Sequence, residues 1–142
     1  MTVKKPKIVG SSEIVDFPRF DMFSVPAKID TGADTGAIHC TAIEEREISG
    51  KSVLRFSPFN HPENVIITTD YTIKKVKSSN GDSSKRYFID TAIILRGKEF
   101  PITLSLADRR EMTWPVLIGK KFLSEQHFLV DVTMGTPVSL AE

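Results

Sequence analysis

The sequence has little of several features that would point to a particular class of protein. Cys40 is the only cysteine, which excludes an internal disulfide and suits a reducing compartment. The net charge is only +1 at pH 7, so no overall field favours nucleic acid or a membrane surface. No apolar run reaches the length of a membrane span, and none follows the first residues as in a signal peptide. We therefore expect a cytoplasmic protein that binds neither nucleic acid nor membranes.

The length and composition are those of a small globular protein. The 142 residues fit one domain, 1–142, and leave little room for a second. An apolar content of 40% is enough for one modest core. No repeat of solenoid length is present.

Short runs rich in β-branched and aromatic residues, separated by turn residues, predict a chain made mostly of strands. Asn80-Gly81 is a strong hairpin signal, and Arg96-Gly97-Lys98 is a weaker one. Only 120–126, directly after Gly119, is expected to be helical. The pattern predicts an all-β protein, a small and largely antiparallel barrel or sandwich with one short helix near the C-terminus. The expected strands are 7–15, 23–29, 52–56, 65–77, 86–95, 100–106, 116–118 and 128–132.

Residues 27–39, AKIDTGADTGAIH, contain the triplet Asp-Thr-Gly twice, beginning at Asp30 and at Asp34. Asp30 directly follows the expected strand 23–29, whereas Asp34 lies inside the turn. A carboxylate at the end of a rigid strand is the better positioned catalyst. Gly32 lets the main chain approach a partner closely. We expect Asp30 to be catalytic, the alternative being an ordinary turn aspartate.

Two stretches of the chain resemble known peptidases. AKIDTGAD, which begins at Ala27, resembles the active-site loop of retropepsin-type aspartic peptidases. PVLIGKKFL, which begins at Pro115, is similar to their apolar-apolar-Gly-Arg step into a short helix. Over about residues 10–133 the chain also resembles a bacterial retropepsin-like family labelled ATP-dependent zinc proteases. This resemblance implies a small closed barrel of the retropepsin type and an aspartic peptidase that acts on a peptide or protein substrate.

The resemblance also implies roles for single residues. Asp30 and Gly32 correspond to the catalytic aspartate and the glycine of the retropepsin triplet. Thr31 corresponds to the threonine whose hydroxyl bonds to the opposite loop across a two-fold axis. Asp34 takes the place of a second acid that binds the substrate main chain and pairs with an arginine after the late glycine, Gly119. In this sequence Lys120 stands where that arginine would be, and a lysine cannot form a bidentate pair with a carboxylate. For Asp34, a side chain that only stabilises its own turn remains an alternative.

An aspartic peptidase requires two carboxylates, about 3 Å apart, that share one proton. The chain has one Asp-Thr-Gly at a strand end, and the second copy is too close in sequence to face it. We therefore expect a symmetric homodimer in which each subunit gives one Asp30. Ala33 has no hydroxyl that could donate to this pair, so we expect a pH optimum nearer mildly acidic or neutral than strongly acidic.

The hairpin 76–87 is placed like the flap that closes over the substrate in retropepsins. Asn80 and Gly81 lie near its tip, basic residues surround it, and we expect Arg86 and Arg109 to contact substrate as well. Proteins of the resembling family are associated with ATP-grasp enzymes that attach glutamate, which implies acidic, glutamate-rich peptides. The alternative is a solvated hairpin whose lysines protect a strand edge.

We expect no metal and no other cofactor. The sequence has no His-Glu-x-x-His, its histidines and Cys40 lack ligand spacing, and no glycine loop would bind phosphate. His39 is expected to pack behind the catalytic loop and to form hydrogen bonds there, and Cys40 to be buried. Two other functions remain open, namely a non-catalytic peptide-binding or dimerisation module with the same fold and a zinc hydrolase.

Overall fold

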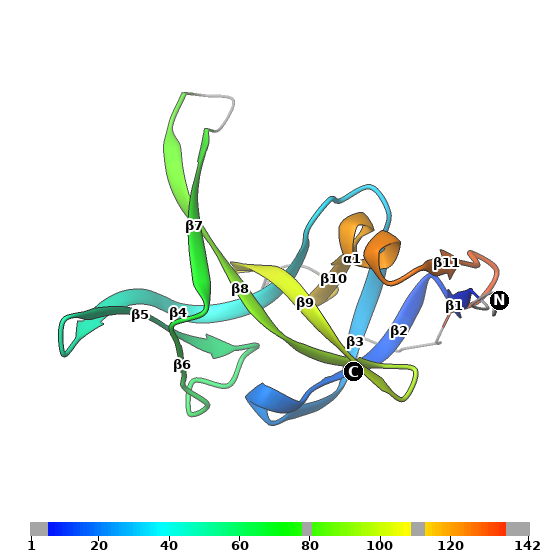
Figure 1. The fold of residues 1–142 in the computed structure, drawn as a ribbon, viewed down its shortest axis with the longest axis horizontal. Helices are drawn as coiled ribbons and strands as arrows, with labels where there is room; N and C mark the ends of the chain where they lie inside the picture. Colours follow the sequence, from blue (N-terminus) through cyan, green and yellow to red (C-terminus); the bar gives the residue numbers. More distant parts are fainter. Residues whose placement is uncertain (1–5, 78–80, 109–112, 136–142) are drawn as a thin grey trace, which may run out of the picture.

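The computed structural model describes residues 6–77, 81–108 and 113–135. Almost every regular element within them is a strand, as the sequence predicts (Figure 1). The helical elements are a short 3₁₀ turn, η1 (Pro18–Phe20), and α1 (Lys120–Glu125). The strands are β1 (Lys7–Val9), β2 (Ser12–Phe17), β3 (Met22–Asp30), β4 (Gly36–Ile48), β5 (Lys51–Pro58), β6 (Ile66–Thr68), β7 (Tyr71–Lys77), β8 (Ser83–Leu95), β9 (Lys98–Ala107), β10 (Val116–Gly119) and β11 (Phe128–Val130).

Six strands close into a barrel in the order β10, β3, β2, β8, β9, β4 and back to β10. Four of these six contacts are antiparallel, while β10 with β3 and β4 with β9 are parallel. Parallel neighbours require long connections, and both pairs join segments from different parts of the chain. The expected barrel is therefore confirmed, and closure of the ring excludes the sandwich.

The barrel is filled by apolar side chains that alternate along its strands. On β8, for example, Ile89, Ile93 and Leu95 are at most 2% exposed, as inward positions of a strand should be. A group of aromatic rings packs α1 against the barrel, where Phe100 meets Phe122 edge to face at 5.9 Å between centroids. This packing stabilises a six-residue helix that would not form alone.

The strand β4 was not predicted from the sequence. Its first half is buried on both faces, so it shows no alternation of polar and apolar residues, and its second half contains the charged run 44–47. The strand is held instead by β10 and β9 on its two sides, and then by β5 further along. Two predicted strands, 7–15 and 65–77, are each divided by a turn into two shorter strands.

Three features extend from the barrel. The strands β4, β5 and β6 form an arm, and the hairpin of β7 and β8 projects away from the body (Figure 1). This hairpin confirms the one predicted at 76–87, since Lys77 is the register partner of Ser83. At the other end of β8, Arg96 and Gly97 form the predicted two-residue turn, both with positive φ. The third feature is a parallel ribbon of β1 and β11. Within the described ranges, no helix is long and apolar enough to cross a membrane.

Candidate active site

Asp30 is the last residue of β3, at the point where the strand enters a turn. On one side its register partner is Gly119, the last residue of β10. On the other side of β3, the N–H of Ile29 donates to the carbonyl of Ser11 at 3.0 Å. The carboxylate is therefore carried by a strand that is held from both edges, as a preorganised site requires.

The turn after Asp30 is held by its own hydrogen bonds. Asp30 Oδ1 accepts a hydrogen bond from the N–H of Gly32 at 3.0 Å, and the Asp30 carbonyl accepts one from Ala33 at 3.3 Å. Thr31 and Gly32 are exposed, whereas Asp30 is half-buried. The carboxylate thus lies beside an open loop that a second molecule could cover.

The N-terminus of α1 anchors the same loop. The N–H of Lys120 donates to the Ala33 carbonyl at 2.7 Å, and that of Lys121 to the Asp34 carbonyl at 3.0 Å. These N–H groups begin a helix and would otherwise lack partners. Glycine is required at 119, because a Cβ there would lie 2.6 Å from the Asp34 carbonyl oxygen and 2.8 Å from the Gly36 nitrogen. The two stretches that resemble retropepsins therefore meet in space.

Asp34 and Lys120 form the pair that the resemblance implies. Lys120 Nζ lies 3.5 Å from Asp34 Oδ1, with the two side chains 65% and 85% exposed. An ion pair this exposed contributes about 0–1 kcal/mol to folding. The pair leaves Asp34 at the surface of the loop, and its part in substrate binding stays a prediction.

The predicted flap residues are only partly within the described chain. Gly81, with φ 88°, and the exposed Arg86 belong to the hairpin that projects from the barrel. Asn80 and Arg109 lie outside the described residues. The structure thus brings Asp30, Thr31, Gly32, Asp34, Gly119 and Lys120 together, and it carries Gly81 and Arg86 on a separate element.

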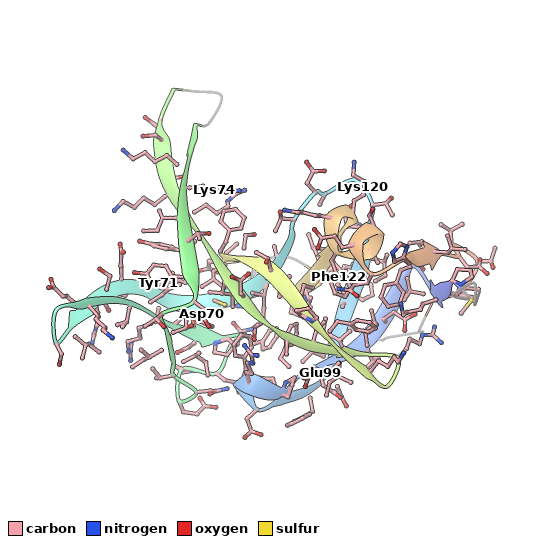
Figure 2. The ribbon with its side chains drawn as sticks, viewed as in Figure 1. Asp70, Tyr71, Lys74, Glu99, Lys120 and Phe122 are labelled. Atoms are coloured by element: carbon pink, nitrogen blue, oxygen red, sulfur yellow. The ribbon has the colours of Figure 1, made fainter. Side chains whose placement is uncertain are left out.

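A cleft of about 290 Å³ opens between the loop, the base of the hairpin and α1. In Figure 2, Lys74 of β7 and Phe122 of α1 lie on opposite sides of this opening. Lys74 Nζ lies 4.9 Å from the centre of the Phe88 ring. The sequence analysis did not identify the residues of β8 that line the cleft. Thr91 was the available signal, because it is a polar residue among the apolar residues of that strand. Thr91 is 5% exposed, and its hydroxyl has no hydrogen-bond partner among the described residues.

His39 and Cys40 are both buried on β4. His39 Nε2 is 2.7 Å from Asn60 Oδ1, and Nδ1 is 3.9 Å from Asp108 Oδ1. The histidine side chain therefore meets the segments after β5 and β9, and its predicted packing behind the Asp30 loop stays a prediction. Burial raises the pKa of the Cys40 thiol far above its ordinary value, so the thiol stays protonated and unreactive. Within residues 6–77, 81–108 and 113–135, no group of three or more His, Cys, Asp and Glu side chains is placed to hold a metal.

Comparison with known proteins agrees with this site. The family "Retropepsin-like aspartic endopeptidase RimB" matches residues 8–136. The chain belongs to this RimB-like family. A crystal structure of a Legionella pneumophila protein of unknown function (DUF785) superposes with a TM-score of 0.72 at 26% identity, and covers 92% of this chain and 97% of that one. The RimB-like chain is therefore an all-β barrel of a type already seen by crystallography.

Curated relatives of this RimB-like chain are longer proteins. A "Probable alpha-L-glutamate ligase" of Shewanella pealeana is 31% identical over 124 residues, which are 84% of this chain and 27% of the ligase. A protein with the same name from Desulfotalea psychrophila is 27% identical over 125 residues, again 84% of this chain and 27% of its own length. The chain therefore spans about a quarter of the length of these curated relatives.

Proposed function

We propose that this protein is an aspartic peptidase that acts as a symmetric homodimer, with water activated between the Asp30 carboxylates of two copies. One observation carries the proposal: Asp30 ends a braced strand beside Gly119, at an exposed loop. Membership of an aspartic endopeptidase family supports the same chemistry. The loop's other acid, Asp34, pairs with Lys120 and is too near in sequence to face Asp30. The second acid must then come from another copy.

In the proposed reaction one Asp30 is ionised and the other holds the shared proton. The ionised carboxylate takes a proton from water as the water oxygen attacks the scissile carbonyl carbon. The protonated carboxyl gives its proton to the carbonyl oxygen, which produces a neutral tetrahedral intermediate. Its collapse passes a proton to the leaving nitrogen, the C–N bond breaks, and an acid and an amine are released.

We also propose that the substrates are acidic, glutamate-rich peptides. On the hairpin, Lys74 is the register partner of Arg86, and Lys75 is the partner of Lys85. Like charges directly opposite one another destabilise a strand pair, so this arrangement costs stability until an anion lies against it. The ligase names of the curated relatives support a glutamate-containing substrate. The lone, buried Cys40 supports a cytoplasmic location.

Asp30→Asn tests the proposed chemistry. The variant keeps the shape of the side chain but cannot share a proton, so peptide hydrolysis should fall at least about a thousandfold. Its circular dichroism spectrum and its sedimentation should match those of the wild type. A wild-type protein that cleaves no member of a mixed peptide library would instead indicate a non-catalytic binding module.

The proposed substrate class is tested with two peptides of equal length, one rich in Glu and one rich in Gln. The double substitution Lys85→Ala with Arg86→Ala should lower kcat/KM for the Glu-rich peptide about tenfold and leave the Gln-rich peptide unchanged. Lys51→Ala, on the exposed tip of the β4–β5 arm, is the matched control. Added salt should lower kcat/KM for the Glu-rich peptide and leave that for the Gln-rich peptide unchanged. Equal losses for both peptides would contradict an acidic substrate.

A further inference from the structure

The hairpin of β7 and β8 projects from the barrel as a two-stranded ribbon (Figure 1). In the described chain β7 pairs with no strand other than β8, so its outer edge has no neighbouring strand. A two-stranded hairpin is marginally stable alone in water and keeps a single position only by packing against other parts of a protein. Side chains at the base of this hairpin therefore decide the angle at which it leaves the barrel.

The register of the hairpin divides its side chains between two faces. Side chains alternate along a strand, and register partners in an antiparallel pair share a face. Thr72 and Lys74 of β7 line the cleft of about 290 Å³, together with Phe88, the register partner of Thr72. Tyr71 precedes Thr72 and therefore points to the opposite face, away from the cleft. In Figure 2, Tyr71 lies on the side of the arm and Lys74 on the side of α1.

On this second face, Tyr71 connects the hairpin to the arm. Its hydroxyl donates to Glu45 Oε2 of β4 at 2.8 Å and accepts a hydrogen bond from the side chain of Ser52 on β5. Its ring lies 6.4 Å from that of Tyr87 on β8, measured between centroids. Burial and the Glu45 carboxylate raise the pKa of Tyr71 above its ordinary value, so the hydroxyl keeps its proton and remains a donor.

We infer that Tyr71 is a positioning residue for substrate binding, whose hydrogen bond to Glu45 fixes the hairpin face that forms one wall of the cleft. The inference rests on the proposed function, because peptide hydrolysis is what gives the cleft a substrate. The strand that carries Glu45 is β4, which begins at Gly36, directly after the Asp30 loop. One strand therefore sets the hairpin wall relative to the catalytic loop. Without the bond the hairpin adopts other angles, and substrate binding must select the competent one.

Tyr71→Phe tests this role, with Tyr87→Phe as the matched control. Tyr71→Phe keeps the ring and removes only the hydroxyl, so KM for the Glu-rich peptide should rise about tenfold, while kcat stays within about twofold. Tyr87→Phe removes a hydroxyl of the same hairpin that forms no hydrogen bond with the described arm, and should behave as the wild type. Glu45→Ala should match Tyr71→Phe, whereas Glu45→Gln keeps an accepting oxygen and should hold KM within about threefold. Urea midpoints establish that each variant is folded.

Peptide binding to Asp30→Asn protein gives a readout that needs no hydrolysis. Calorimetry should give a Kd for the Glu-rich peptide that is about tenfold higher when Tyr71→Phe is added to Asp30→Asn. Adding Glu45→Ala as well should weaken binding no further, because both changes remove the same hydrogen bond.

The two measurements separate failure of the positioning role from failure of the proposed function. A Tyr71→Phe protein with wild-type KM, or one whose kcat falls while KM is unchanged, would overturn the positioning role and leave the Asp30 mechanism in place. A wild type that binds the Glu-rich peptide without cleaving it would overturn the proposed chemistry. Weaker binding in Tyr71→Phe would then still support the positioning role.

Discussion

Gly119 and Asp30 are register partners at the ends of two parallel strands, β10 and β3. The strand β10 lies between β3 and β4, the two strands that the Asp30 loop connects. Directly after Gly119, α1 begins and donates two N–H groups back to that loop. Gly119 and Lys120 therefore hold the main chain around Asp30 in place.

Gly119→Ala should both destabilise the protein and stop hydrolysis. The added Cβ would lie 2.6 Å, 2.8 Å and 2.9 Å from main-chain atoms of the loop, which cannot move away as a flexible side chain could. We expect the free energy of unfolding to fall by about 1–3 kcal/mol. Urea unfolding and peptide hydrolysis check this. Gly50→Ala, with no neighbour within 4 Å but φ +79°, should cost only about 1 kcal/mol and leave hydrolysis intact. Wild-type stability and activity in Gly119→Ala would contradict this account of the loop.

Arg96→Ala should destabilise the protein at a site far from the chemistry. Arg96 donates to both oxygens of Glu13, at 2.9 Å and 2.7 Å, and the Glu13 side chain is only 6% exposed. Among the described residues, removing the arginine leaves the buried carboxylate with the N–H of Gly10 as a donor, which should cost about 1–3 kcal/mol. Lys98→Ala, on the exposed side of the same turn, should change stability by less than about 0.5 kcal/mol. Equal urea midpoints for the two variants would show that the buried pair contributes nothing.

Asp131→Asn should remove a stabilising contribution that depends on pH. Hydrogen bonds from the hydroxyl and the N–H of Thr133, at 2.6 Å and 2.9 Å, hold the pKa of Asp131 below its ordinary value. As the pH falls, Asp131 is therefore protonated in the unfolded chain before it is protonated in the folded protein. Its contribution to the free energy of unfolding is complete above the ordinary pKa of about 3.9 and is lost as the pH falls through the pKa of the folded state. Thermal melts should separate wild type from Asp131→Asn at pH 7 and converge near pH 2. A constant difference would contradict the assignment.

Ala33→Ser should move the pH profile of hydrolysis toward acid. In the wild type, residue 33 bonds through its main chain: its N–H donates to the Asp30 carbonyl, and its carbonyl accepts from the N–H of Lys120. A serine hydroxyl that donates to an Asp30 carboxylate would favour its ionised form, so the acid limb of kcat/KM should shift down by about half a pH unit or more. Ala33→Val, without a hydroxyl, is the control. A serine profile that overlies the wild type would show that this position does not reach the carboxylates.

Several elements could be predicted because the signal lies within a few neighbouring residues. Asp30 follows a run with strand character, Asn80-Gly81 signals the hairpin of β7 and β8, Arg96-Gly97 favours a two-residue turn, and Gly119 precedes the helix. In each case the local backbone chemistry already restricts the conformation. The prediction failed at β4, whose charged half is exposed and whose buried half shows no period of two. It also missed Asn60 as the partner of His39.

The sequence by itself determined which aspartate ends a strand and where the hairpins turn, because short-range sterics and turn chemistry decide those features. Only the tertiary structure decided how β4 is held and how the barrel closes through β10. Those outcomes depend on the registers of strands that are distant in the chain, and pairing between such strands is selected by the packing of the whole core.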